Sequence, residues 1–129
     1  MPHDIKPGSP EHWLKHAESD LNIACIRDKN ILLSQLCFHA QQCVEKSLKA
    51  LLLKQDIEFP KTHNIAVLIE HLPQNLEKPD FLFNSASLTE FAVESRYPSD
   101  AEEISIGEYE ESIEIAASVL NWTRMIIRE

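Results

Sequence analysis

Apolar residues recur along this chain every three or four positions, the spacing that places side chains on one face of an α-helix. No stretch alternates convincingly with the two-residue period of a β-strand. The clearest pattern predicts a helix over about residues 31–55, and its core-facing side chains would be Leu33, Cys37, Ala40, Val44, Leu48 and Leu51.

Further helices are predicted on both sides of this one. The first begins at Pro10, because Ser9 can cap it and proline is favoured at the first helical position. We expect it to end near residues 28–30. A short helix capped by Thr62 is predicted over 63–71, and a fourth helix over 80–95. The core-facing residues of the first helix would be Trp13, Ala17, Leu21 and Ala24.

The last helix carries the strongest start signal. Ser105 and Glu108 match the capping box, in which the two side chains bond to each other's backbone amides. Ile104 and Tyr109 then fall at the positions of a hydrophobic staple. The sequence therefore predicts an all-α antiparallel bundle of about five helices in a single domain, residues 1–129, whose residues 1–9 form a flexible N-terminal segment.

Composition and charge restrict the function. The 129 residues are 43% hydrophobic and 26% charged, as in one ordinary globular domain, and the net charge is −9. Residues 1–79 hold 9 bases and 10 acids, whereas residues 80–129 hold 3 bases and 11 acids. Such a surface repels nucleic acid, so we expect no binding to duplex DNA by the chain on its own.

The expected location is the cytoplasm. No apolar run approaches the roughly 20 residues that span a membrane, so we expect no membrane association. The three cysteines form no CxxC pair, which favours reduced thiols in the cytoplasm.

His39 and Cys43 lie one turn apart, but two ligands do not make a metal site, and neither glycine lies in a phosphate-binding loop. We therefore expect no metal and no cofactor.

A second set of side chains repeats at helical spacing within residues 31–55, roughly opposite the apolar one. Glu45 flanks it and can pair with Lys49 one turn later. Two interpretations remain open: a solvated helix face, or a groove for a phosphate or a second subunit. The members of this polar face are Gln35, His39, Gln42, Lys46 and Lys49.

His63 and Arg96 are the two candidates for catalysis. His63 falls at the predicted start of the 63–71 helix, where the positive end of the helix dipole would favour a neutral imidazole able to act as a base. The alternative is a structural histidine that bonds to a neighbouring loop. Arg96, followed by Tyr97, is either a clamp on nearby carboxylates or a fork for a phosphate.

Three blocks of this sequence, Phe38 to Leu53, Pro60 to Asn64 and Ser95 to Pro98, closely resemble the prokaryotic HEPN domain family. Their order and spacing match from about residue 13 to 127. The resemblance implies a fold of about five helices and a homodimer. It also implies a set of activities, since many members are metal-independent RNases, often toxins paired with a minimal nucleotidyltransferase, and others bind nucleotides.

The chain departs from the RNase members of that family. Those members carry an arginine and, after four to six further residues, a histidine. Here the corresponding positions after Arg96 hold Ala101, Glu102 and Glu103, and no histidine follows Arg96. The HxY extension, at which partner enzymes of some family toxins attach a nucleotide, is also missing.

We therefore expect a nucleotide- or partner-binding module that acts with a minimal nucleotidyltransferase in a toxin–antitoxin-type pair. One alternative is a metal-independent RNase toxin that uses Arg96 with His63 as a substitute acid or base. Another is a dimerisation scaffold with the polar face buried between two copies. The expected binding residues are Gln42, Glu45, Lys46, Lys49, His63, Arg96 and Tyr97.

Overall fold

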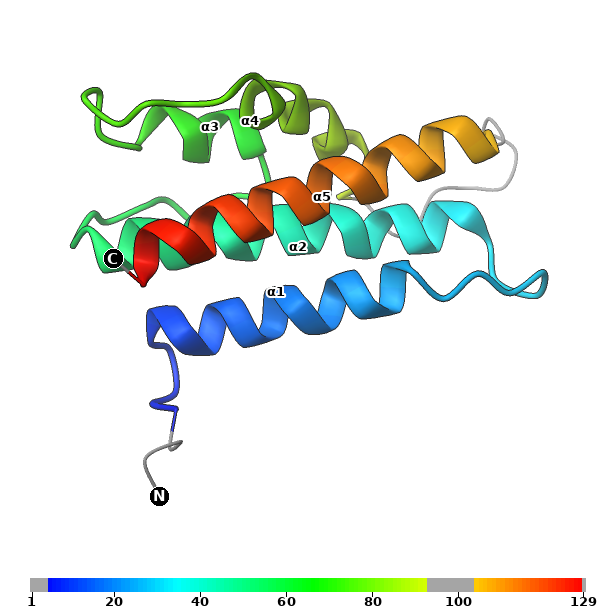
Figure 1. Ribbon diagram of the computed structural model, residues 1–129, viewed down its shortest axis with the longest axis horizontal. Coiled ribbons are helices and arrows are strands. Elements are labelled where there is room, and N and C mark those ends of the chain that lie inside the picture. The colour runs from blue at the N-terminus through cyan, green and yellow to red at the C-terminus, as the bar shows by residue number, and fades with distance from the viewer. Residues whose placement is uncertain (1–4, 93–103, 129) are drawn as a thin grey trace.

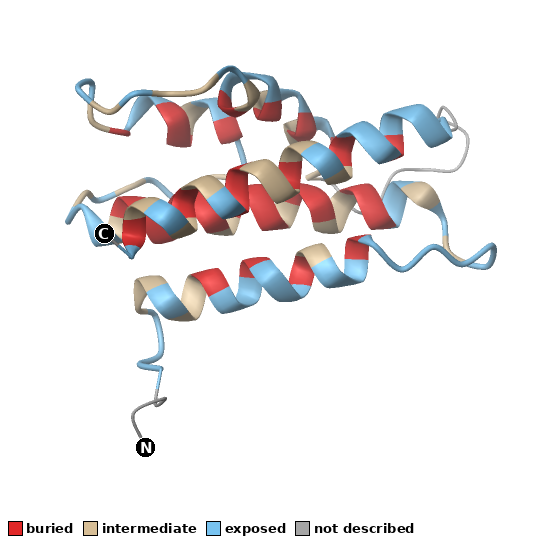
Figure 2. Cartoon of the chain, in the orientation of Figure 1, coloured by how far each residue is buried: buried red, intermediate tan, exposed pale blue. Residues whose placement is uncertain are grey.

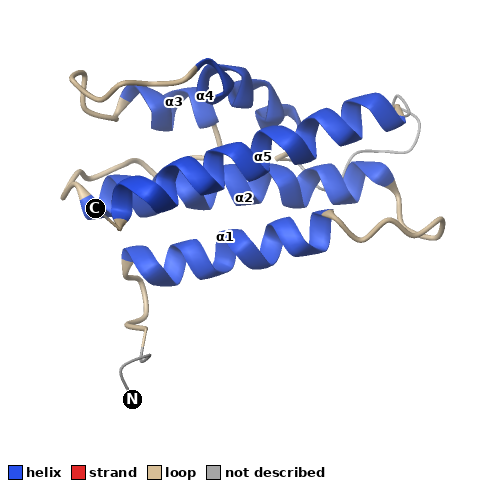
Figure 3. Cartoon of the chain, in the orientation of Figure 1, coloured by secondary structure: helices blue, strands red, loops and turns tan. Residues whose placement is uncertain are grey.

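Three long helices lie side by side and form the body of the protein (Figure 1). The computed structural model describes residues 5–92 and 104–128. Shorter helical segments cover one side of the long helices, and Figure 3 shows helices and loops but no strand in the described part of the chain. The predicted all-α bundle is confirmed. The elements are α1 (Pro10–Ala24), α2 (Leu33–Lys54), α3 (Ile65–Glu70), α4 (Asp80–Asn84), the 3₁₀ helix η1 (Ser85–Phe91) and α5 (Ile106–Ile127).

Helix α2 lies at the centre of the bundle. It packs against α1, α3, η1 and α5, and Figure 2 shows buried residues along most of its length. α1 runs antiparallel to α2, whereas α5 runs in the same direction as α2 after the chain has returned through α3 and η1 (Figure 1). The centres of α2 and α5 meet where Cys43 Sγ lies 3.8 Å from the carbonyl oxygen of Ala116.

The predicted helix starts of α1 and α5 are confirmed in detail. The Ser9 hydroxyl accepts a hydrogen bond from the His12 amide at 3.2 Å. Ser105 and Glu108 form both bonds of the capping box. The Tyr109 hydroxyl then donates to the carbonyl oxygen of Ala24 at 2.5 Å, which ties the start of α5 to the end of α1.

The short elements differ from the sequence prediction. α3 begins at Ile65 because the Asn64 side chain, and not that of Thr62, accepts the capping hydrogen bond, here from the Ala66 amide. The predicted 80–95 helix is α-helical only as far as Asn84 and continues as η1. Ser85 and Ser87 donate to carbonyls three residues earlier, and such side-chain bonds compete with regular α-helical bonding.

The first helix is also shorter than predicted, since α1 ends at Ala24 and not near residues 28–30. Among the described residues, no helix has the length and apolar character needed to cross a membrane.

Candidate functional site

The predicted polar face of α2 is exposed at Gln35 and partly buried at His39, Gln42 and Lys46. Its last member Lys49 and the flanking Glu45 are buried, so the interpretation as a solvated surface does not hold at that end of the face. Glu45 is 3% exposed and Lys49 is 8% exposed. α1 covers this face from one side and the 57–64 segment covers it from the other, with the Trp13 and Phe59 rings each 5.7 Å from Lys49 Nζ. The two rings meet edge to face, with their centroids 6.4 Å apart.

Glu45 is the centre of a hydrogen-bonded group that we call the Glu45 cluster: Glu45, Gln41, Lys49 and His63. The Lys49 ammonium donates to Glu45 Oε2 at 2.8 Å. Gln41 Nε2 donates to Glu45 Oε1 at 3.0 Å, and His63 Nδ1 lies 2.8 Å from the same oxygen. Gln41 Nε2 also lies 3.3 Å from the carbonyl oxygen of His63, which fixes the loop before α3 to α2.

The environment of Glu45 keeps its carboxylate charged. Burial alone would raise the pKa of Glu45, but hydrogen bonds from Lys49, Gln41 and His63 together outweigh the burial and lower the pKa below its usual value. A charged carboxylate only accepts hydrogen bonds, so His63 Nδ1 carries the proton in this contact. The His63 side chain is 69% exposed, which leaves Nε2 facing solvent.

The Lys49 ammonium is already fully engaged. It forms an ion pair with Glu45 and lies over two aromatic rings, an arrangement that stabilises a desolvated cation. A phosphate at this position would have to displace the carboxylate of Glu45. The geometry therefore gives Lys49 the role of holding the cluster together.

A second acid-centred group lies between α1 and α2, and we call Asp20, His39 and Lys46 the Asp20 cluster. Lys46 Nζ donates to Asp20 Oδ2 at 2.7 Å, and His39 Nδ1 lies 2.9 Å from Asp20 Oδ1. Asp20 is buried, whereas the side chains of His39 and Lys46 are partly exposed. Each cluster thus pairs a buried carboxylate with one lysine and one histidine.

The structure brings four of the predicted binding residues together, namely Gln42, Glu45, Lys49 and His63, and places Lys46 in the Asp20 cluster. Gln42 joins the Glu45 cluster, because its Nε2 donates to Gln41 Oε1 at 2.7 Å. Arg96 and Tyr97 lie outside the described residues. His63 lies before the α3 cap, so the helix-dipole argument does not apply to it, and Glu45 is the charge that orients its ring.

Sequence reasoning missed Asp20 and Gln41. Asp20 falls between Ala17 and Ala24 at a core-facing position of α1, and Gln41 falls between Cys37 and Val44 on α2. A polar residue at a core-facing position predicts a buried hydrogen-bonded group, and this signal was available at both positions.

In the described part of the chain, no group of three or more His, Cys, Asp or Glu side chains is arranged to hold a metal ion.

The arrangement presents two oriented imidazoles rather than free cations. In each cluster a carboxylate holds histidine Nδ1, so that Nε2 is the ring nitrogen left for a ligand or a proton. This geometry suits hydrogen bonding to a partner or proton transfer more than electrostatic capture of a phosphate.

Comparisons with known proteins agree with this fold. The family model of the HEPN domain matches residues 10–126. The chain is 27% identical to a Methanocaldococcus jannaschii protein named "Putative toxin MJ1304", over 91% of this chain and 87% of that protein.

Two crystal structures resemble the chain over nearly its whole length. ST0689, described as an archaeal HEPN homologue, is 30% identical with a TM-score of 0.70, and the match covers 95% of this chain and 99% of that one. TT1696 from Thermus thermophilus has a TM-score of 0.75, covering 90% of this chain and 96% of that one. At 24% identity, TT1696 supports the fold alone.

Proposed function

The chain belongs to the HEPN domain family, and we propose that it acts as a partner-binding module of a toxin–antitoxin-type pair, together with a minimal nucleotidyltransferase. Family membership and the similarity to a protein named as a toxin support a toxin-like role. The partner is inferred from the activities that accompany this domain in other members of the family.

The observation that carries the proposal is the Glu45 cluster, which holds His63 in a fixed orientation at the surface. The buried carboxylate, two further side chains and the His63 carbonyl together restrict the ring and its loop. A polar surface that is fixed before binding loses little conformational entropy when a partner docks. Gln42 and the exposed edges of His39 and Lys46 extend this surface along α2.

Nucleotide binding through Lys46 and Lys49 is disfavoured by the same contacts. Both ammonium groups are already paired with buried carboxylates, at 2.7 and 2.8 Å. A nucleotide phosphate would have to break these pairs and leave Asp20 or Glu45 buried without a counter-ion, which is costly. The partner-binding form of the hypothesis therefore fits the described residues better than the nucleotide-binding form.

Co-expression tests the proposal. The tagged chain is expressed alone and together with a minimal nucleotidyltransferase from the same genome, and growth and co-purification are measured. We expect growth arrest by the chain alone, rescue by the partner, and a stable complex that His63→Ala and Gln42→Ala weaken. Glu114→Gln, at an exposed position of α5, serves as the control and should leave the complex intact. Normal growth without a complex would contradict the proposal.

A second candidate function, a metal-independent RNase, is favoured by one specific observation. Glu45 holds His63 through Nδ1 and leaves Nε2 exposed, which is the arrangement of an oriented general acid or base. The test is incubation of the purified protein with a pool of labelled RNAs and a chelator. Cleavage that is lost in both His63→Ala and Arg96→Ala would support this candidate, and intact RNA with the unsubstituted protein would exclude it.

A further inference from the structure

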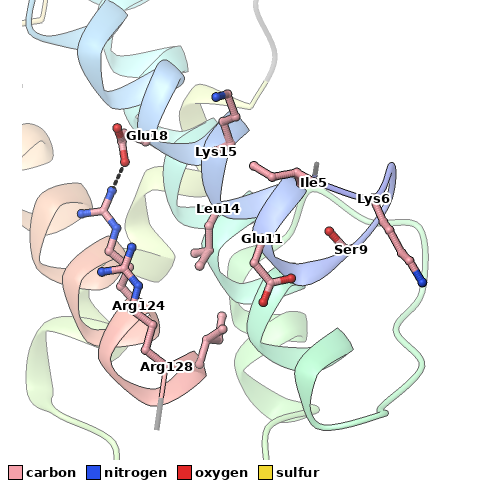
Figure 4. Close-up of a pocket in the computed structure, with 10 residues that line it drawn as sticks. Ile5, Lys6, Ser9, Glu11, Leu14, Lys15, Glu18, Arg124 and Arg128 are labelled. Carbon is pink, nitrogen blue, oxygen red and sulfur yellow. Dashed lines mark hydrogen bonds and ion pairs between the residues drawn. The ribbon is translucent and has the colours of Figure 1, made fainter. Parts of the chain in front are cut away.

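A cleft separate from both clusters lies between the start of α1 and the end of α5, and we call it the α1–α5 cleft (Figure 4). Its volume is about 560 Å³. Its walls come from α1 and α5, and the segment before α1 contributes Ile5 and Lys6. None of its lining residues belongs to the Glu45 cluster or the Asp20 cluster.

The α1–α5 cleft is cationic, although the chain as a whole is acidic. Four basic side chains and two carboxylates line it, a local surplus of two positive charges in a chain of net charge −9. Arg124 pairs with Glu18, as Figure 4 shows. Within the described residues, the side chains of Lys6, Lys15 and Arg128 form no ion pair or hydrogen bond, so their charges are available to a ligand.

The remaining lining residues restrict the chemistry of that ligand. Aliphatic side chains of Ile5, Leu14 and Ile127 contribute to the lining, and the described lining residues include no aromatic ring on which a nucleobase could stack. Glu11 and Glu18 lie on either side of Lys15 along α1, so a ligand with a negative charge on every unit, such as a run of phosphates, would meet carboxylates between its basic contacts. A polypeptide matches this mixture better, because it can place carboxylates, apolar side chains and backbone amides within a few residues.

The surface also continues beyond the α1–α5 cleft. A second hollow of about 630 Å³ shares Arg124 and Arg128 with the cleft, and Asn121 and Met125 complete its lining. Met125 is 68% exposed, and methionine adapts readily to apolar side chains of a partner. A ligand that crosses the two arginines can therefore contact both hollows, which requires an extended segment rather than a single small anion.

We propose that the α1–α5 cleft binds an acidic polypeptide segment in which carboxylate and aliphatic side chains alternate. The carboxylates pair with Lys15, Arg128 and Lys6, and the aliphatic side chains contact Ile5 and Met125. This inference goes beyond the proposed partner-binding function of the Glu45 cluster, because it concerns a different surface and does not require the nucleotidyltransferase.

The proposal is tested with a fluorescently labelled peptide of alternating Glu and Leu, whose binding to the full chain is measured by fluorescence anisotropy at low salt. We expect saturable binding that weakens as salt rises. The double variant Lys15→Glu/Arg128→Glu should weaken it by about tenfold or more, since two attractive contacts become repulsive. Lys29→Glu/Lys61→Glu, at exposed positions of the loops after α1 and after α2, reverses the same number of charges outside the cleft and should bind as the unsubstituted chain does.

Three outcomes would overturn the proposal. The first is unchanged affinity in the double variant, once circular dichroism has shown that it is folded. The second is equal affinity for the same peptide with Gln in place of Glu. The third is displacement of the peptide by a single-stranded RNA oligonucleotide at lower concentrations than by the unlabelled peptide, which would assign the α1–α5 cleft to nucleic acid.

Discussion

Replacing Glu45 by Gln removes the negative charge that compensates the buried Lys49 ammonium. Both residues are buried and their charged atoms are 2.8 Å apart. Removing one partner of a buried ion pair costs about 3–5 kcal/mol, because the other charge is left without compensation. The aromatic rings over Lys49 offset a part of this cost. We therefore expect Glu45→Gln to lower the free energy of unfolding by about 3 kcal/mol or more, a large share of the 5–15 kcal/mol typical of a domain.

The assay is equilibrium unfolding in urea, followed by tryptophan fluorescence and by far-ultraviolet circular dichroism. Trp13 lies close to Lys49, so its fluorescence also reports local changes at the cluster. The variant Lys49→Met in the Glu45→Gln background should recover stability, because it removes the uncompensated ammonium. Glu114→Gln, at an exposed position of α5, should change stability by about 0.5 kcal/mol at most.

Two results would refute this reasoning. A loss of less than about 1 kcal/mol in Glu45→Gln would mean that water or a rearranged side chain compensates Lys49. Additive losses from Glu45→Gln and Lys49→Met would mean that the two residues do not stabilise each other, despite the short distance between them.

Three further predictions follow from the buried groups. The pKa of Glu45 is lowered in the folded chain, so the stabilisation that its carboxylate gives the fold is complete above the ordinary pKa of 4.5 and is lost as the pH falls through the lower folded value. The urea midpoints of the unsubstituted chain and of Glu45→Gln should therefore converge in acid. Parallel pH profiles of the two midpoints would contradict this. Tyr109→Phe should cost about 1–3 kcal/mol by urea unfolding, because the buried carbonyl of Ala24 loses its donor, and an unchanged midpoint would show that the bond contributes nothing. Burial raises the pKa of Cys43 to about 12, so a thiol reagent should modify the exposed Cys25 first and Cys43 only on unfolding; equal rates in the folded chain would contradict the buried position.

Local signals in the sequence were sufficient for most of the fold. The caps at Ser9 and Ser105 act within one turn of helix, so the sequence alone locates the starts of α1 and α5. The short elements could not be located in this way. Whether Thr62 or Asn64 caps α3 depends on how the preceding loop is fixed to α2, which is a tertiary contact.

The site could be predicted only in part, because α2 lies at the centre of the bundle and other elements cover its polar side chains. Helical spacing identified Glu45, Lys49 and their i, i+4 pairing, and the pair is confirmed. It could not show that α1 and the 57–64 segment bury the pair, since those contacts join residues far apart in the sequence. For the same reason, the sequence points to His63 only through its place near a predicted helix start, whereas in the structure Glu45 orients its ring.

The composition of the Glu45 cluster bears on its role. A buried ion pair is often no more stabilising than well-packed apolar side chains of similar volume, so stability alone does not account for Glu45 and Lys49 in the core. Their contacts do account for the fixed ring of His63, the member of the cluster that reaches solvent.

The double variant Glu45→Leu/Lys49→Met separates the role of the cluster in stability from its role in orienting His63. We expect it to unfold at a urea concentration close to that of the unsubstituted chain, and yet to lose affinity for the proposed nucleotidyltransferase partner to the same extent as His63→Ala. Full affinity in a stable double variant would mean that binding does not depend on how Glu45 orients the histidine.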